Sequence, residues 1–217
     1  MSTESVVIDQ NVQCPPLQAS PSEIKRFLEV IQQNILPKTR GGVDLGNKVF
    51  GAAVLSSDLK SVVLADTNSE ISCPIFHGEV KVIYEWSKLI EPSKRGPAAQ
   101  SSIFLSTHEP CCMCISAILW AGFTKVFYFF PYESTTSQGI PHDINTMHEL
   151  WGVNSYRKQN KFLSTACIMD LIDNLGDGKE KEELKAMKDD IIKSYDELSL
   201  KYHKEKLTNT DNSLVLG

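Results

Sequence analysis

Two cysteines and one histidine in this chain have the types and spacing of metal ligands. Cys111 and Cys114 stand three residues apart, so both thiolates can face one side of a helix's first turn and bind a single ion. His77, upstream in the chain, supplies an imidazole as a third ligand. Zn²⁺ held by two thiolates and one imidazole keeps its fourth position open, and the pKa of water there falls toward neutrality. The pattern therefore predicts a zinc site that activates water.

Glu79 follows His77 by two residues and could face the open position without being a ligand. A carboxylate there can take a proton from the activated water and deliver it to a departing nitrogen. Loss of ammonia from an amino-substituted ring carbon needs both proton transfers. The combination predicts Glu79 as the catalytic residue of a hydrolytic reaction.

Each half of this pattern is ambiguous when it is taken alone. Cys111 and Cys114 could be a buried pair or a redox dithiol, and a single histidine is more often a core or capping residue than a ligand. However, both halves fall where an expected strand meets an expected helix, which favours metal binding. The remaining cysteines are expected to be small packed residues: Cys14, Cys73, Cys112 and Cys167.

The motifs His77-Gly78-Glu79 and Pro110-Cys111-Cys112-Met113-Cys114 have the H-x-E and P-C-x-x-C pattern of zinc deaminases. Over roughly residues 22–130 the chain resembles the cytidine deaminase-like superfamily, which includes cytosine, guanine and tRNA adenosine deaminases. The resemblance implies a central mixed sheet flanked by helices, one zinc ion per active site and commonly a dimer or larger assembly.

Two features are similar to the guanine and tRNA adenosine branches of that superfamily. Glu109 precedes Pro110, and the run Ala-Ile-Leu-Trp-Ala occupies 117–121. Two others depart from the usual pattern. Gly78 stands where alanine is usual, and glycine destabilises the first helical turn by about 1 kcal/mol relative to alanine. His108 is an uncommon residue before Glu109.

Substrate contacts are also implied by the resemblance. Asn68 matches the position of a substrate-contacting asparagine, with an ordinary turn residue as the alternative. Asp143 could approach the pocket as in guanine deaminases, or it could cap a helix. Three aromatic side chains are candidates either to stack on a base or to pack in the core: Phe129, Tyr132 and Trp151.

The elements that must position these residues follow from periodicity and capping signals. A helix begins with a capping box at 20–23 and is expected to end at Pro37, with a loop over 39–48. A hairpin spans 49–55 and 61–65, followed by a helix at 77–90, a strand at 102–106, the cysteine helix at 110–122 and a strand at 125–130. In the 77–90 helix the inward residues are expected to be Val80, Ile83, Tyr84 and Leu89. Alternation of strands and helices predicts an α/β layer structure with at least one parallel pair of strands and helices on both faces. Together with the resemblance, this implies a three-layer α/β/α fold with a central mixed sheet.

The domain organisation is expected to be simple. Residues 1–19 form an irregular arm, 20–176 the deaminase domain, 177–206 an amphipathic helix and 207–217 a disordered tail. Within the domain, 131–142 is expected to be a long polar loop and 143–150 a short helix, while 151–176 fits a strand or a helix equally well.

Composition and charge narrow the choice of partners. The net charge of -5 provides no general basic field for a polyanion, which disfavours tRNA. No signal-peptide pattern and no bilayer-length apolar run occur, so we expect a cytoplasmic protein, or a nuclear one, without membrane contact. The leading hypothesis is a homodimeric zinc deaminase of a small-molecule nucleobase or nucleoside, with guanine or guanosine preferred. The alternatives are a tRNA adenosine deaminase, or its catalytic subunit, and a non-catalytic zinc scaffold.

Overall fold

The computed structural model describes residues 13–209 of the chain. Most of the arm expected at 1–19 and most of the tail expected at 207–217 therefore lie outside the described residues. Residues 13–19, which lie inside, have no regular secondary structure.

A five-stranded mixed sheet forms the centre of the molecule, with strand order β2-β1-β3-β4-β5. The hairpin of β1 (Gly51–Ser56) and β2 (Val62–Thr67) is antiparallel, as expected, and β1 also pairs antiparallel with β3 (Ser102–His108). β4 (Lys125–Phe130) runs parallel to both β3 and β5 (Ser164–Cys167). The parallel strands place the ends of β3 and β4 at one edge of the sheet.

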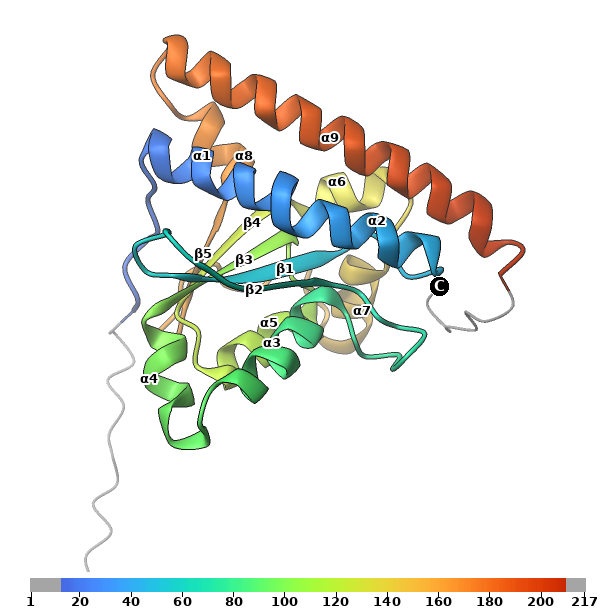
Figure 1. Cartoon of the computed structure of the whole chain (residues 1–217), viewed down its shortest axis with the longest axis horizontal. Coiled ribbons are helices and arrows are strands. Elements are labelled where there is room, and N and C mark those ends of the chain that lie inside the picture. Colours follow the sequence, from blue (N-terminus) through green and yellow to red (C-terminus); the bar gives the residue numbers. More distant parts are fainter. Residues whose placement is uncertain (1–12, 210–217) are drawn as a thin grey trace, which may run out of the picture.

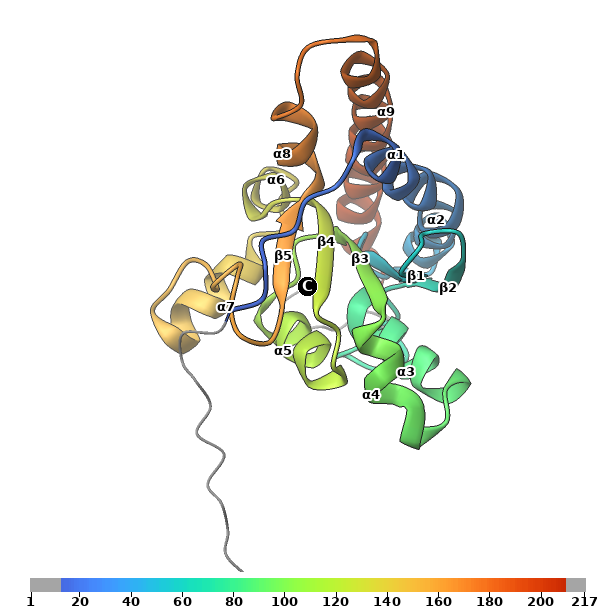
Figure 2. The same ribbon diagram turned by 90° about the vertical axis from the view of Figure 1, so that its left-hand side faces the viewer.

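Helices cover both faces of this sheet, which confirms the expected three-layer α/β/α fold (Figures 1 and 2). One face carries α1 (Pro21–Val30), α2 (Leu36–Asp44), α8 (Ile168–Asp173) and α9 (Lys179–Lys206). The other face carries α3 (Gly78–Leu89), α4 (Arg95–Gln100) and α5 (Cys112–Ala121), with a short 3₁₀ turn at Pro92–Lys94 between α3 and α4. Each face has its own cluster of buried apolar side chains.

The first helix begins as expected but continues past Pro37. Ser20 and Glu23 form the reciprocal capping box. A π-helical turn at Ile31–Ile35 then joins α1 to α2, and its wider hydrogen bond runs from the Leu36 N–H to the Ile31 carbonyl. Pro37, which has no backbone N–H, follows directly after this π-helical turn, in the first turn of α2. The expected stop at Pro37 and the first part of the expected 39–48 loop are therefore wrong.

The inward face of α3 also differs from the expected one. Glu79, Val82 and Trp86, spaced three and then four residues apart, are buried, whereas Tyr84 and Leu89 are exposed. The helix carries two neighbouring apolar stripes, and apolar pattern alone does not say which one faces the sheet. The stripe in register with Glu79 is the one that packs inward.

The region after β4 contains more helix than expected. α6 (Tyr132–Ser137) occupies half of the predicted polar loop, and α7 (His142–Trp151) agrees with the predicted short helix. The unassigned segment 151–176 contains both β5 and α8. In α9 the expected apolar stripe packs into the cluster shared with α1 and the sheet, through Leu184, Ile191, Tyr195, Leu198 and Tyr202. Among the described helices, none is both long and apolar enough to cross a membrane.

Candidate metal centre and pocket

The three predicted ligands stand at the N-termini of two helices on the same face of the sheet. His77 is the N-cap of α3, and its extended backbone (φ -61°, ψ 156°) turns the chain from the preceding loop into the helix. Cys111 is the N-cap of α5 in a similar conformation (φ -63°, ψ 172°), directly after β3, and Cys114 lies in the first turn. Two helix N-termini leave free N–H groups and positive dipole ends at the site, which favour thiolates over thiols.

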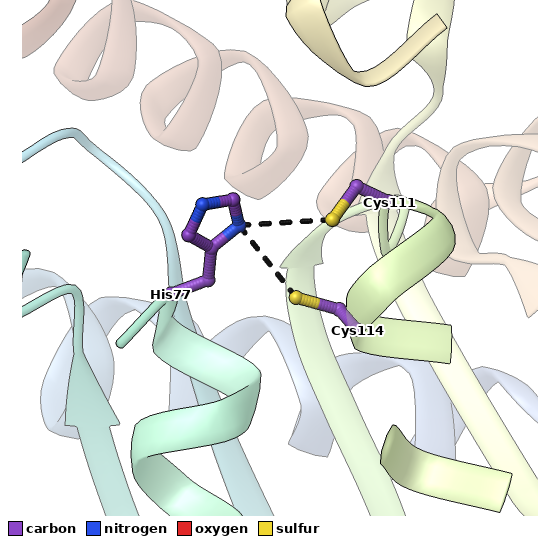
Figure 3. Close-up of side chains that lie close together, drawn as sticks. All are labelled: His77, Cys111 and Cys114. Atoms are coloured by element: carbon purple, nitrogen blue, oxygen red, sulfur yellow. Dashed lines mark hydrogen bonds between the residues drawn. The ribbon is translucent and has the colours of Figure 1, made fainter. Parts of the chain in front are cut away.

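His77, Cys111 and Cys114 form a cluster that fits Zn²⁺ (Figure 3). The Nδ1 atom of His77 lies 3.7 Å from the Sγ atom of each cysteine, and the three ligand atoms lie within 4.8 Å of one another. A tetrahedral zinc ion with bonds of about 2.3 Å to sulfur and about 2.0 Å to nitrogen would place these atoms about 3.6 Å apart. The observed separations therefore match a metal ion between them.

Burial affects the protonation state of the cysteine ligands. Desolvation raises the pKa of the Cys114 thiol to about 12, so the bare side chain would stay protonated at neutral pH. A bound cation would stabilise both thiolates in this place, in addition to the two helix N-termini. Cys112 does not join the cluster: it is buried beside α7, with its Sγ atom 3.9 Å from Thr146 Oγ1.

Glu79 is held next to the cluster, in the first turn of α3. Its carboxyl is buried, and the Ser106 hydroxyl donates a hydrogen bond of 2.9 Å to its Oε1 atom. Desolvation is the main cause that raises the pKa of Glu79, while hydrogen bonds from its own backbone, Ser106 and the Cys114 thiol lower it. A buried carboxyl with a raised pKa beside a metal site is suited to carrying a proton.

Asn68 lies at the end of β2 and is completely buried. Its Oδ1 atom accepts a hydrogen bond of 2.5 Å from the Gly78 N–H, the first N–H group of α3. Its Nδ2 atom is buried without a hydrogen-bond partner among the described residues. Asn68 therefore fixes the start of the helix that carries Glu79 and retains one unused donor.

A pocket of about 270 Å³ opens onto the metal cluster and has Asp143 in its wall. The residues that line it come from the β1 approach, the two helix N-termini and α7: Lys48, Phe50, Pro74, His77, Cys111, Cys112, Met113, Ile140, His142, Asp143, Thr146 and Leu150. Desolvation, and then the charge of Glu79, raise the pKa of Asp143 to about 7. Asp143 lies in the first turn of α7, but the N-cap is Pro141, so the expected capping alternative is wrong.

The aromatic candidates do not line this pocket. Phe129 is in the core, and the Tyr132 hydroxyl donates a hydrogen bond of 2.6 Å to the Pro110 carbonyl. Trp151 is exposed at the end of α7. The aromatic side chain that lines the pocket is Phe50 instead. The sequence did not indicate this role, because a phenylalanine just before a strand is usually a core residue.

His108 packs against the ring of Phe50 and does not line the pocket. It is buried between Phe50 and Phe130, with ring centroids 4.7 Å from each. Its ring nitrogens face Thr107 Oγ1 at 3.0 Å and Gln138 Oε1 at 3.1 Å. Desolvation lowers the pKa of His108 to about 3, so the ring is neutral and structural at physiological pH.

Comparison with known proteins agrees with this geometry. Residues 27–130 match the model of the cytidine and deoxycytidylate deaminase zinc-binding region. A mutant of the protein NE0047, solved in complex with 8-azaguanine, has 15% sequence identity and a TM-score of 0.50, with 84% of this chain and 89% of that chain covered. No curated protein matches the chain in sequence.

Two other solved structures are similar in fold. Guanine deaminase from Nitrosomonas europaea has 15% identity and a TM-score of 0.48, with 85% of this chain and 90% of that chain covered. A structure from a study of A-to-I editing by tRNA:A34 deaminases has 15% identity and a TM-score of 0.43, with 71% and 97% covered.

Together, the α/β/α fold and the His/Cys/Cys cluster at two helix N-termini define an α/β protein built around a zinc site. The matched region then agrees with the predicted resemblance: residues 27–130 are similar to the zinc-binding region of cytidine and deoxycytidylate deaminases. Both the predicted resemblance and the predicted zinc cofactor are confirmed.

Proposed function

We propose that this chain is a zinc-dependent hydrolytic deaminase that releases ammonia from a free nucleobase or nucleoside, with a purine such as guanine or guanosine preferred. The observation that carries the proposal is the buried Glu79 carboxyl, oriented by Ser106 beside a metal cluster that opens into a pocket. A zinc site that only stabilised the fold would need neither the acid nor the pocket, which argues against a scaffold role.

The residues at the site have separate tasks. His77, Cys111 and Cys114 would hold the zinc ion, which would supply a water with a pKa near neutrality. The Glu79 carboxyl would accept a proton from the attacking water and deliver it to the departing amino group. Ser106 holds the Glu79 carboxyl in place through Oε1, and Asn68 fixes the helix turn from which Glu79 projects.

The pocket suits a flat, neutral ring. Phe50 and Ile140 give it apolar walls, onto which the π-face of a base can pack. Asp143 can accept N–H groups of a purine. Asn68 is not among the residues that line the pocket, so its role here is to fix the start of α3. At about 270 Å³ the space is slightly below the roughly 300–1,000 Å³ of pockets for drug-sized ligands, which favours a free base over a nucleotide.

The direct test is ammonia release by the purified, zinc-loaded protein. The substrates are guanine, guanosine, adenine, adenosine, cytosine and cytidine, each compared with the Glu79→Ala variant after its zinc content has been measured. Release from one compound that disappears in Glu79→Ala supports the proposal and names the base. No release from any of them by a protein with one zinc per chain contradicts it, and release from tRNA instead would assign the editing reaction.

The expected assembly and location belong to the same proposal: a homodimer that acts in the cytoplasm. The indole of Trp120, on the outer surface of α5, is 86% exposed, which suits a covered interface better than open solvent. Sedimentation of the wild type as a dimer, and of Trp120→Glu as a monomer, would support this assembly. A monomeric wild type contradicts it, and imaging of a tagged chain in cells tests the location.

A further inference from the structure

A buried ion pair between Lys48 and Glu70 lies beside the metal cluster, and the residue motifs do not account for it. Both residues are buried, with exposures of 5% and 2%. The Lys48 ammonium lies 3.1 Å from Glu70 Oε1, and the Lys48 backbone N–H donates a hydrogen bond of 3.0 Å to Glu70 Oε2. Lys48 thus contacts both carboxylate oxygens of Glu70, which fixes the orientation of that side chain.

That orientation brings Glu70 to the ring of His77. The Oε1 atom lies 4.0 Å from His77 Nε2, on the side of the ring opposite the two sulfur atoms. Within the described part of the chain, Glu70 Oε1 forms an ion pair with Lys48 but accepts no hydrogen bond. Among residues 13–209, no other carboxylate comes as close to a ring nitrogen of His77.

The position matters because a neutral imidazole carries only one N–H group. The nitrogen that faces the cysteines, Nδ1, must present a lone pair to bind a metal, so the proton has to be on Nε2. A carboxylate on the Nε2 side favours this tautomer. At 4.0 Å the contact is longer than a hydrogen bond, so the carboxylate acts through its charge, which is strong at a buried site.

We propose that Glu70 is a positioning residue that keeps the neutral His77 ring with its proton on Nε2 and its Nδ1 lone pair directed at Cys111 and Cys114. Lys48 holds Glu70 in place through its ammonium group and its backbone N–H. Carboxylates behind metal-binding histidines act in this way in other zinc sites, and their loss typically costs about 10–100-fold in metal affinity. The proposal concerns the metal site alone and holds whatever the substrate is.

The decisive measurement is the ¹⁵N spectrum of the imidazole rings in zinc-free, reduced protein at about pH 8, where a free imidazole is neutral. The wild type is expected to show His77 protonated on Nε2 and unprotonated on Nδ1. Glu70→Gln keeps the size of the side chain and removes the negative charge that faces Nε2. The His77 proton is therefore expected to move partly to Nδ1, and zinc affinity, measured by competition with a chelator, to fall about 10-fold.

Glu109→Gln is the matched control. Glu109 is as deeply buried and is paired with a lysine, Lys158, but its carboxylate makes no contact with His77. Its substitution should leave the His77 tautomer unchanged.

A second measurement uses zinc-loaded protein and remains possible if the zinc-free protein unfolds. The His77 Nε2 proton should exchange with water more slowly in the wild type than in Glu70→Gln.

Two outcomes would overturn the proposal. One is a wild-type His77 protonated on Nδ1, which needs no variant and so remains decisive if Glu70→Gln does not fold. The other is a Glu70→Gln protein with the wild-type tautomer, proton exchange and zinc affinity. Because neither readout involves a substrate, failure here is distinguishable from failure of the deaminase proposal.

Discussion

Ser106 on β3 donates a hydrogen bond of 2.9 Å to Oε1 of Glu79 on α3, and both side chains are buried. The contact joins a central strand to the first turn of the helix that begins at the metal site. Because Ser106 precedes Cys111 by only five residues on the same strand-to-helix segment, the acid and the thiolate ligands are held by one piece of chain. The orientation of Glu79 therefore depends on β3 and not on the metal alone.

The first prediction removes this hydrogen bond. Hydrogen bonds to charged groups contribute about 1.5–3 kcal/mol, so Ser106→Ala should reduce kcat about 10- to 100-fold. Zinc content should stay at the wild-type value, since Ser106 does not touch the ligands. Steady-state rates and metal analysis of the same preparation test both statements.

Ser87→Ala is the control, because Ser87 lies on the same helix and its hydroxyl bonds only a backbone carbonyl at the surface. It should keep the wild-type rate. Equal rates for Ser106→Ala and wild type would show that Ser106 does not orient Glu79.

The second prediction separates the two neighbouring cysteines. Cys114→Ala removes a ligand and should lower the zinc content from one per chain toward none, with a clear fall in Tm because metal binding stabilises the fold. Cys112→Ala should retain zinc, since its sulfur faces Thr146 instead of the cluster. Metal analysis with thermal unfolding distinguishes them. Full zinc content in Cys114→Ala would remove this residue from the ligand set.

The sequence was sufficient for the metal site because its ligands are local signals. Short stretches of sequence show the spacing of Cys111 and Cys114 and the position of His77 before a helix. The capping box of Ser20 and Glu23 is recognised in the same way. Pro37 misled because the π-helical turn that accommodates it depends on packing over the whole of α1 and α2.

Long-range pairings could not be predicted from the sequence. Lys48 and Glu70 are 22 residues apart and look like ordinary loop charges until the fold brings them together behind His77. The wall formed by Phe50 likewise depends on how β1 lies against α7 and the helix N-termini. The spacing of Cys111 and Cys114 is local, whereas the pocket residues and the approach of His77 to the cysteines depend on tertiary structure.

The third prediction concerns Gly78, at the start of α3. A Cβ atom at this position would lie 2.7 Å from the Cα atom and 2.9 Å from the backbone nitrogen of Gly51, closer than packing allows. Gly78→Ala should therefore destabilise the protein by about 1–3 kcal/mol, although alanine is the better helix former. Urea unfolding measures the difference.

Gly41→Ala gives the opposite expectation. Gly41 is also helical, in α2, but nothing lies within 4 Å of its added Cβ atom. Its substitution should stabilise the protein by about 0.5–1 kcal/mol. A stabilised Gly78→Ala protein would show that α3 can move away from β1. The short distance between Gly78 and Gly51 would then not require glycine at position 78.

The fourth prediction is a pH dependence of stability caused by His108. Burial lowers its pKa to about 3 in the folded state, whereas an unfolded histidine titrates near about 6.5. Between these values the unfolded chain binds more protons, so stability is complete above about pH 6.5 and decreases as the pH falls below it. At about pH 5 the loss due to this one group is about 2 kcal/mol.

His108→Gln removes the titrating ring and should reduce the loss of stability between about pH 7.5 and about pH 5 by that amount. The zinc ligands also bind protons in acid, but they do so in both proteins, so the difference between the two pH profiles isolates His108. Urea unfolding at both pH values gives the comparison. Parallel profiles would mean that the folded protein admits a proton to this ring, and that the aromatic packing of Phe50 and Phe130 around it opens in acid.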